Sequence, residues 1–545
     1  MSGSTAAAAG GRAGSAWAPL REPVFRSLWI AQFGANVGTW AQTVGAQWLM
    51  GDLGGGALAV SLVQTAATMP VFLLVLPAGA LGDVLDRRRL LIASQAIMFL
   101  ASASLAVLTV AGVTTVGLLL ALAALMGTGT ALAMPTFAAI QPELVAREEL
   151  PSAALLNGAN LNVARALGPA LGGLLIGAAG PEATFALNAL AVVGVVSALV
   201  AWERPPDDRP LGSEPIADAI VAGARYVRST PAFATILART LMFVVFASAL
   251  WALLPVVARG PLDLEAGGYG VLLAAVGAGA VAGAFAIPAL RARLGTNGLV
   301  GAASVAYGAG LLVVGAVDAL APVVAALALC GFAWIATMSS LSAGAQVILP
   351  NWARARALAF TNLIFMGGLA FGSVLWGAVA EGWSLRTAFA VAAAGLVAGP
   401  LAGSRRLPLG AVGDVRPARH WPEPNVEWEV DPSDGPVLVI VEWPIPPESA
   451  DAFLAAMVPV RRARRRTGAT MWGIFRDLEQ PDLFVETFVV DSWHEHLRQH
   501  LERHTVADEE ADRAAVRFLA EGDVPRIRHL VWAERRERRL RRPGR

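Results

Sequence analysis

The sequence predicts an all-α polytopic membrane protein with twelve transmembrane helices in two six-helix bundles, followed by a small cytoplasmic α+β domain. Hydrophobic residues make up 56% of the 545 residues and charged residues 15%, whereas soluble proteins are roughly a quarter charged. Apolar runs of about 20 residues, long enough to cross a bilayer, recur up to residue 403. Beyond residue 436 the pattern changes to short alternating strands and amphipathic helices.

Twelve apolar runs are candidate spans. We place them at 24–50, 57–79, 90–110, 115–137, 153–178, 183–202, 235–258, 269–289, 298–317, 321–346, 357–380 and 384–403. A polar segment at 203–234 separates six spans from six, which predicts bundles at 24–202 and 235–403 joined by a cytoplasmic central loop. Within that loop, 216–226 is amphipathic and suits a membrane surface. Residues 1–23, rich in Ala, Gly and Ser, are predicted to be a disordered cytoplasmic tail.

Arginine placement predicts the orientation of the chain. The loop at 79–89 ends in three consecutive arginines and joins two uncharged runs, so it is expected on the cytoplasmic side. Most other arginines outside the spans fall in loops on that same side, whereas the opposite loops hold Arg259 and Arg386. The topology therefore places both termini in the cytoplasm and the protein in the cell membrane.

The charged loop also carries a motif. Gly79-Ala-Leu-Gly-Asp-Val-Leu-Asp-Arg-Arg-Arg89 resembles the loop between the second and third helices of the major facilitator superfamily. Val84 and Asp86 stand where that signature usually has Arg and Gly. The resemblance implies that a set of matching positions acts in conformational switching: Gly79, Asp83, Arg87 and Arg88.

The two halves of the chain contain similar sequence segments. A Pro-headed segment at 142–147 precedes the fifth span, and another at 350–354 precedes the eleventh. The glycine pattern at 168–173 has a counterpart at 368–373. Repeated halves favour a pseudo-twofold transporter that holds its substrate between the bundles.

A polar stripe marks the first span as a candidate wall of the substrate pathway. Its members recur at steps of three or four and so share one helical face: Gln32, Asn36, Thr39, Thr43 and Gln47. Lipid cannot satisfy these groups, so they are expected to face a cavity or another helix. Substrate contact and interhelical hydrogen bonding both remain open.

The fifth span adds Asn162 and Arg165 on one face. An arginine near the bilayer centre costs about 2.5–3.5 kcal/mol on insertion scales and usually pairs or faces a cavity. The next turns resemble the core of the antiporter signature of drug exporters, and their expected role is helix packing: Gly168, Pro169, Gly172 and Gly173. For Arg165, a structural ion pair or a bond to helix carbonyls is the alternative to substrate contact.

Several segments together resemble the transmembrane secretion effector branch of that superfamily, including 25–29, 38–42, 83–89, 165–173 and 252–259. Phe137 departs from the more polar residue expected there. The branch is similar to enterobactin exporters and macrolide efflux pumps. The resemblance implies proton-coupled export of small amphiphilic molecules, such as a drug, siderophore or secondary metabolite. No Asp or Glu lies in the middle of a span, which leaves Asp52, Glu22 and Asp83 as candidates for the coupling carboxylate.

Three parts are predicted in the tail, residues 404–545: a Pro-rich linker at 404–436, an α+β domain at 437–535 and a basic end at 536–545. Strands are expected at 437–443, 471–476, 483–490 and 527–532, with helices at 447–466, 492–504 and 508–521. This order resembles the ferredoxin-like fold of antibiotic-biosynthesis monooxygenases, which pair as dimers. It implies a possible homodimer. The arginine runs at 461–466 and 535–542 suit anionic lipid headgroups or a solvated surface.

Three histidines are predicted to line one helix face in the tail: His496, His500 and His504. Such spacing can bind zinc, but no cysteine or suitably spaced acidic residue joins them, so we predict no metal site. We also predict no cofactor, no catalytic residue and no enzyme, and the net charge of +1 gives no indication of nucleic-acid binding. The alternative functions are uptake by a transporter of the same superfamily and a membrane-anchored enzyme acting through the tail.

Overall fold

The computed structural model describes residues 17–203, 216–406, 414–416, 418, 426, 430–520 and 523–533. The chain divides into two compact units. The first comprises Met1–Ser213, Thr240–Ser339 and Asn362–Gly403, and the second comprises Glu214–Arg239, Ser340–Thr361 and Ser404–Arg545.

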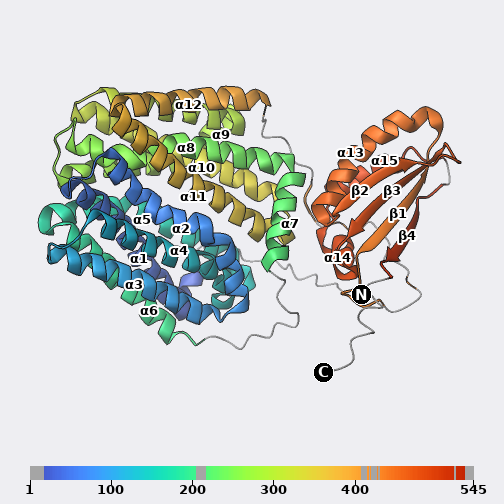
Figure 1. Cartoon of the computed structure of the whole chain (residues 1–545), viewed down its shortest axis with the longest axis horizontal. Helices are drawn as coiled ribbons and strands as arrows, with labels where there is room; N and C mark the ends of the chain where they lie inside the picture. Colours follow the sequence, from blue (N-terminus) through green and yellow to red (C-terminus); the bar gives the residue numbers. More distant parts are fainter. Residues whose placement is uncertain are drawn as a thin grey trace, which may run out of the picture. The chain divides into compact units, whose positions relative to one another are not determined.

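The first unit is built from long helices that lie side by side (Figure 1). The first half of the chain contributes a short 3₁₀ turn, η1 (Ala18–Arg21), and six helices: α1 (Pro23–Asp52), α2 (Ala57–Val84), α3 (Arg87–Val110), α4 (Val116–Leu144), α5 (Leu150–Ala179, after the turn η2, Arg147–Glu149) and α6 (Pro181–Ala201). Beyond the central loop, the chain forms α7 (Ile216–Ser229), α8 (Pro231–Arg259), α9 (Ala266–Ala316), α10 (Leu320–Ile348), α11 (Asn351–Gly382) and α12 (Leu385–Arg406). Nine of the described helices are long and apolar enough to cross a membrane.

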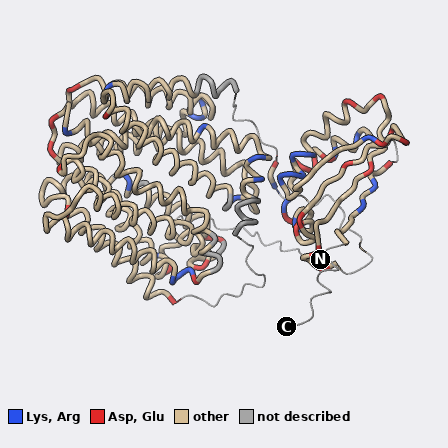
Figure 2. Tube along the Cα trace, viewed as in Figure 1, with Lys and Arg blue, Asp and Glu red and all other residues tan. Residues whose placement is uncertain are grey.

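Local sequence explains where these helices begin. Pro23 occupies the first turn of α1, where its missing N–H costs nothing. The Asp86 side chain caps α3 by accepting a hydrogen bond from the Arg89 backbone N–H at 2.8 Å, and Thr115 caps α4 in the same way. Charged residues gather at helix ends and in the C-terminal domain, while the helix interiors are almost free of charge (Figure 2).

One predicted loop differs from the structure. The sequence predicts separate spans at 269–289 and 298–317, but α9 runs through both as a 51-residue element. It is interrupted at Gly295, whose φ of 66° and ψ of 171° are not helical. Glycine adopts this positive φ without a Cβ penalty, so a sharp break replaces the expected loop.

The second unit contains a four-stranded antiparallel sheet in the order β2-β3-β1-β4. Its strands are β1 (Val437–Pro444), β2 (Met471–Arg476), β3 (Leu483–Val490) and β4 (Arg526–Val531). The central strand β1 pairs Val437 with Val490 of β3 and with Val531 of β4. The strands thus lie where the alternating pattern predicts them.

Helices cover one face of this sheet (Figure 1). They are α13 (Ala450–Thr467, after the turn η3, Pro447–Ser449), α14 (Trp493–Arg498), the π turn η4 (Gln499–Arg503) and α15 (Val506–Val516). Alternate residues of β1 point into a core with Trp443, Phe453 and Met457. The predicted helix at 492–504 was wrong in part. Because the π turn follows Arg498 and His504 is extended (ψ 139°), the three histidines do not continue along one regular helix face.

A buried charge network ties α13 to the sheet and to α15. The Arg464 guanidinium lies 3.0 Å from Asp512 and 3.3 Å from Glu486, and all three side chains are at most 5% exposed. Trp472 Nε1 also donates to Glu486 at 2.9 Å. Arg464 is therefore a core residue, which corrects the prediction that the whole run at 461–466 meets lipid or solvent. The other basic run, 535–542, lies outside the described residues.

Candidate functional site

The N-terminal half of the polar stripe on α1 is joined to α5. Gln32 Nε2 donates to Asn36 Oδ1 at 3.2 Å, and Asn36 Nδ2 donates to Asn160 Oδ1 at 2.9 Å. Asn160 in turn donates to the Trp29 carbonyl at 2.9 Å. Gln32 Oε1 is buried and accepts no hydrogen bond from the described residues.

The C-terminal half of the stripe contacts three further helices. Thr39 Oγ1 donates to Asn188 Oδ1 of α6 at 3.4 Å, and Thr43 donates to the Thr39 carbonyl. Gln47 Nε2 donates to the Trp251 carbonyl of α8 at 3.2 Å, and the Tyr269 hydroxyl of α9 donates to Gln47 Oε1 at 2.9 Å. In this conformation most of the stripe serves interhelical hydrogen bonding, which is the alternative that the sequence left open.

A polar cluster beside the stripe escaped the sequence analysis. Asn188 Nδ2 donates to Gln42 Oε1 at 2.7 Å and to Ser102 Oγ at 2.9 Å, and Ser102 donates to Gln42 at 2.7 Å. All three side chains are at most 5% exposed. Each hydrogen bond has its partner inside the bundle, so this cluster holds α1, α3 and α6 together and offers little to a ligand.

Arg165 lies against an aromatic ring instead of an acid. Its guanidinium carbon is 5.5 Å from the centroid of the Trp40 ring, within the range of a cation–π contact. Its Nε is buried without a hydrogen-bond partner among the described residues. The side chain of Asn162, predicted to share this face, lies outside the described part of the chain. A partly buried guanidinium whose Nε–H has no partner among the described residues can bind a polar or anionic group.

Trp40 continues into an aromatic cluster that the sequence analysis missed. Its ring is 6.1 Å from that of Trp251, which is 5.6 Å from Trp334, and Trp334 is 6.1 Å from Phe365. The indole N–H groups of Trp251 and Trp334 are buried and make no hydrogen bond with the described residues. Tryptophan in the middle of a span was the available signal, because membrane proteins concentrate it at the interfaces.

We call this group the aromatic site; its members are Trp40, Arg165, Trp251, Trp334 and Phe365. They lie on α1 and α5 of the first half and on α8, α10 and α11 of the second. It combines apolar ring faces with one cation and two indole donors. Such a surface suits a molecule with a flat apolar body and a polar or anionic group. A separate open groove of about 440 Å³ between α2 and α4 includes none of these residues; its lining is apolar apart from Thr65.

The four packing residues predicted in the fifth span lie in α5, and its glycines meet two different helices. A Cβ on Gly168 would come within 2.5 Å of Trp40 Cβ, and one on Gly172 within 2.9 Å of Ala41 Cα, both on α1. A Cβ on Gly173 would come within 2.4 Å of Gly270 Cα on α9. Pro169 lies between them inside the helix and is buried. The small residues thus permit close backbone approach to a helix of each half of the chain.

The arginines of the predicted switch loop, residues 79–89, contact helices of the same half of the chain. Arg87 forms an ion pair with Glu143 of α4 at 2.9 Å and donates to the Ala139 carbonyl at 2.9 Å. Arg88 donates to the carbonyls of Leu199 and Val200 at the end of α6, where a cation is favoured by the helix dipole. Gly79 faces α4, because a Cβ added to it would lie 3.8 Å from Pro135 Cβ. The Asp83 side chain lies outside the described residues.

At the opposite end of the helices, polar contacts join the two halves. Arg259 of α8 forms a 2.7 Å ion pair with Asp52 of α1 and donates to the Trp48 carbonyl at 2.7 Å. Between α2 and α11, Leu58 N–H donates to Glu381 Oε2 at 3.2 Å, and Thr65 donates to the Ala370 carbonyl at 3.0 Å. These contacts close one end of the interface between the halves.

Long apolar helices in two halves of the chain, with an aromatic and cationic site between them, define a membrane transporter. The chain matches the family described as transmembrane secretion effector over residues 14–537 and belongs to it. This confirms the resemblance of the membrane part to the major facilitator superfamily.

Two curated relatives support this family. The chain is 26% identical to the multidrug efflux pump Tap of Mycolicibacterium fortuitum over 382 residues, covering 68% of this chain and 92% of that protein. It is 28% identical to the staphyloferrin A transporter of Staphylococcus aureus over 155 residues, covering 28% of this chain and 39% of that protein. The family and these relatives are transporters, so the chain is a transporter and not an enzyme.

Solved structures share the fold. The nucleoside transporter NupG aligns with a TM-score of 0.58 at 13% identity, covering 70% of this chain and all of that one. A bacterial homologue of the human lysosomal transporter Spinster aligns with a TM-score of 0.55 at 13% identity, covering 70% and 95%. Identities this low concern the fold alone.

Proposed function

We propose that this protein is a proton-coupled exporter of small amphiphilic molecules that works by alternating access. The observation that carries the proposal is the aromatic site, in which Arg165 and two unused indole N–H groups lie among ring faces contributed by both halves. Export is favoured by the relative that is a multidrug efflux pump. The staphyloferrin A transporter adds a relative whose named cargo is a siderophore.

We further propose twelve spans with both termini in the cytoplasm. Nine described helices meet the length and hydropathy expected of a span. The polar stripe lowers the hydropathy of α1, Gly295 divides α9 into two helical segments, and α12 has a shorter apolar stretch at Leu385–Gly399. Counting these three as spans gives bundles at 24–202 and 235–403, with the loop 203–234 between them.

Alternating access would use the contacts at the two ends. The Arg259–Asp52 pair closes the predicted outer end, so the described conformation corresponds to access from the cytoplasm. Closure of the cytoplasmic end would require the switch loop, with Asp83 and Arg87 contacting facing helix termini. Asp83→Asn is expected to shift the population towards the inward-open state, and unchanged labelling of a reporter cysteine in the cytoplasmic mouth would contradict this role.

The coupling proton needs a titratable group that reaches both sides of the membrane. Asp52, Glu22 and Asp83 remain the proposed candidates. Asp52 is the best placed, because its partner Arg259 belongs to the other half of the molecule and proton binding would weaken the pair that closes the outer end.

Direction and coupling can be tested in inverted membrane vesicles carrying the full chain. A panel of anionic, neutral and cationic fluorescent amphiphiles is added under an acid-inside gradient, with and without a protonophore. The proposal expects gradient-dependent accumulation of at least one compound. Accumulation solely in right-side-out vesicles would instead establish uptake.

The C-terminal domain, residues 437–535 after the linker 404–436, is proposed to be ferredoxin-like. The strand order β2-β3-β1-β4, with α13 between β1 and β2 and further helices before β4, supports this assignment. We propose that it regulates or dimerises the transporter. Truncation after Ser404 should retain export while altering oligomer size, and loss of export with unaltered oligomer size would contradict a dimerising role.

A further inference from the structure

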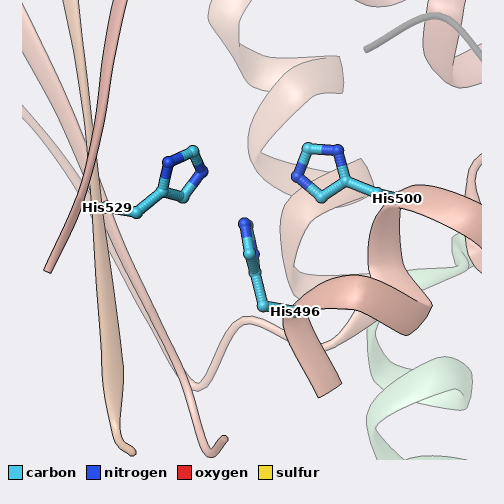
Figure 3. A group of neighbouring side chains, drawn as sticks. All are labelled: His496, His500 and His529. Atoms are coloured by element: carbon cyan, nitrogen blue, oxygen red, sulfur yellow. The ribbon is translucent and has the colours of Figure 1, made fainter. Parts of the chain in front are cut away.

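A cluster of three histidines lies in the C-terminal domain, far along the chain from the aromatic site. His496 of α14, His500 of the π turn and His529 of β4 point their rings toward one another (Figure 3). Their ring centroids are 4.5 Å apart for His496 and His500 and 4.8 Å apart for His496 and His529. One nitrogen from each ring can be chosen so that all three lie within 4.8 Å of one another.

The burial of these rings is hard to explain by packing alone. Both ring nitrogens of His496 are buried, and neither makes a hydrogen bond of ordinary geometry with a described residue. The Gln499 side chain interacts with the ring; because its amide N–H₂ donates to Thr467 Oγ1 at 2.8 Å, its Oε1 is left to accept from one of the two His496 nitrogens. His529 Nε2 is likewise buried without a partner in the described part. Buried polar nitrogens normally have partners, and a bound ion would supply one.

The third ring differs from the sequence prediction. His504, the residue expected from the i, i+4, i+8 spacing, places its Nε2 3.2 Å from Asp512 Oδ2 and belongs to the Arg464 network. The third ring of the cluster is instead that of His529, which lies on a strand 25 residues further along the chain. The cluster therefore joins two segments that could not be paired by spacing.

We propose that His496, His500 and His529 form a binding site for one divalent transition-metal ion of the Zn²⁺ type. Three neutral imidazoles and an open fourth position are an established zinc arrangement. Imidazole also suits Cu²⁺ and Ni²⁺, which are the expected competitors. The site rests on these residues alone and is independent of the proposed transport function.

The surroundings fit an ion of this class. A tetrahedral ion with metal–nitrogen distances of about 2.0–2.1 Å needs nitrogens about 3.3 Å apart, so side-chain rotations must bring the rings closer together. Burial, followed by the neighbouring histidines His500 and His529, lowers the pKa of His496 to about 2. Burial likewise lowers the pKa of His500 to about 4. The rings are therefore in the neutral form that binds metals.

A small cavity lined by two of the three rings, those of His500 and His529, leaves room for the fourth ligand. Its volume is about 20 Å³, enough for one water-sized group. Its lining includes Val439, Phe488, Arg464, His500, His504 and His529. The nearby positive charge of Arg464 is offset by Glu486 and Asp512, so a cation can bind close to it.

The test uses the full chain in detergent, purified with a tag that contains no histidine and freed of metal with a chelator. Zn²⁺ is titrated by calorimetry, and bound metal is counted after gel filtration. The expected result is one ion per chain. His529→Gln and His496→Gln should each weaken binding by at least about 10-fold, the lower bound for loss of even an outer-shell partner.

Matched controls come from the same segment. His494→Gln changes a histidine of α14 outside the cluster, and His504→Gln changes one bound to Asp512; both should retain the wild-type affinity. Co²⁺ provides a second readout, because a tetrahedral site gives it d–d absorption that His529→Gln should abolish. His529 lies on an edge strand, so this variant decides the question if His496→Gln fails to fold. Absence of Zn²⁺ binding by the wild type, or equal binding by all variants, would overturn the proposal.

Discussion

Arg259 of α8 and Asp52 of α1 form a 2.7 Å ion pair across the two halves of the transporter. The Arg259 guanidinium also lies 3.8 Å from the centroid of the Trp48 ring. A single arginine thus contacts a carboxylate, a backbone carbonyl and an aromatic face of the opposite half. Arg259 thus links the two halves through three different contacts at the predicted outer end.

Arg259→Gln should loosen that end. Partly exposed ion pairs contribute up to about 1 kcal/mol, which corresponds to a roughly fivefold shift in a two-state population. The shift can be measured as faster thiol labelling of Ser61→Cys, because Ser61 is fully buried between α2 and α11. Replacing the buried Cys330 by serine leaves the reporter as the single thiol.

A matched control is available within the second half. Arg386 pairs with Asp318 at 3.1 Å on the surface, and both residues belong to the same half. Arg386→Gln should leave labelling of the reporter unchanged. Equal labelling rates in Arg259→Gln and the parent protein would show that the pair does not hold the outer end closed.

Gly173→Ala should also loosen the predicted outer end and speed labelling of the Ser61→Cys reporter, in this case through overpacking. The new Cβ would lie 2.4 Å from Gly270 Cα, so α5 and α9 must separate. Overpacking of this kind costs about 1–3 kcal/mol and should favour conformations in which the two helices are apart. Gly177→Ala is the control on the same helix, since its Cβ would meet Gly267 at an ordinary 3.8 Å. Identical reporter labelling in both variants would contradict the close crossing.

Arg464→Met should destabilise the C-terminal domain by about 3–5 kcal/mol, because it leaves Glu486 and Asp512 buried without their counter-charge. Hydrogen exchange at the β1 amides of the full chain measures this loss. The control is Arg513→Met, since Arg513 is itself exposed and its partner Glu509 lies one turn away on the same helix, and it should cost less than about 0.5 kcal/mol. Equal protection in the two variants would disprove a structural role for the network.

Much of the fold could be predicted from the sequence because the bilayer imposes a simple rule. A span must be apolar over about 20 residues, and charges must gather at its ends, as they do around Arg87 and Arg259. The strands of the C-terminal domain could also be predicted, because residues buried in β1 alternate with partly exposed ones and produce an alternating sequence pattern. Gly295 shows the limit, because a helix break and a short loop produce similar sequence patterns.

The candidate sites were harder to predict because they depend on tertiary contacts. Arg165 was recognisable as a charge inside a span, but its partner Trp40 is on another helix. His529 approaches His496 because β4 pairs with the central strand β1, a long-range contact that spacing does not encode. Arg464 resembles its exposed neighbours in sequence and differs from them through burial alone.

The most direct test of the account is transport by Arg165→Gln in inverted vesicles. Loss of the guanidinium removes its hydrogen bond to a polar or anionic group of the substrate, which should cost about 1.5 kcal/mol of substrate binding, or roughly a tenfold rise in KM. Wild type and variant are compared at matched membrane abundance, with Arg386→Gln as the surface control. The account predicts gradient-driven accumulation by the wild type and the control, and a KM about tenfold higher for Arg165→Gln. Equal KM and maximal rate in all three proteins would contradict a substrate site at Trp40 and Arg165.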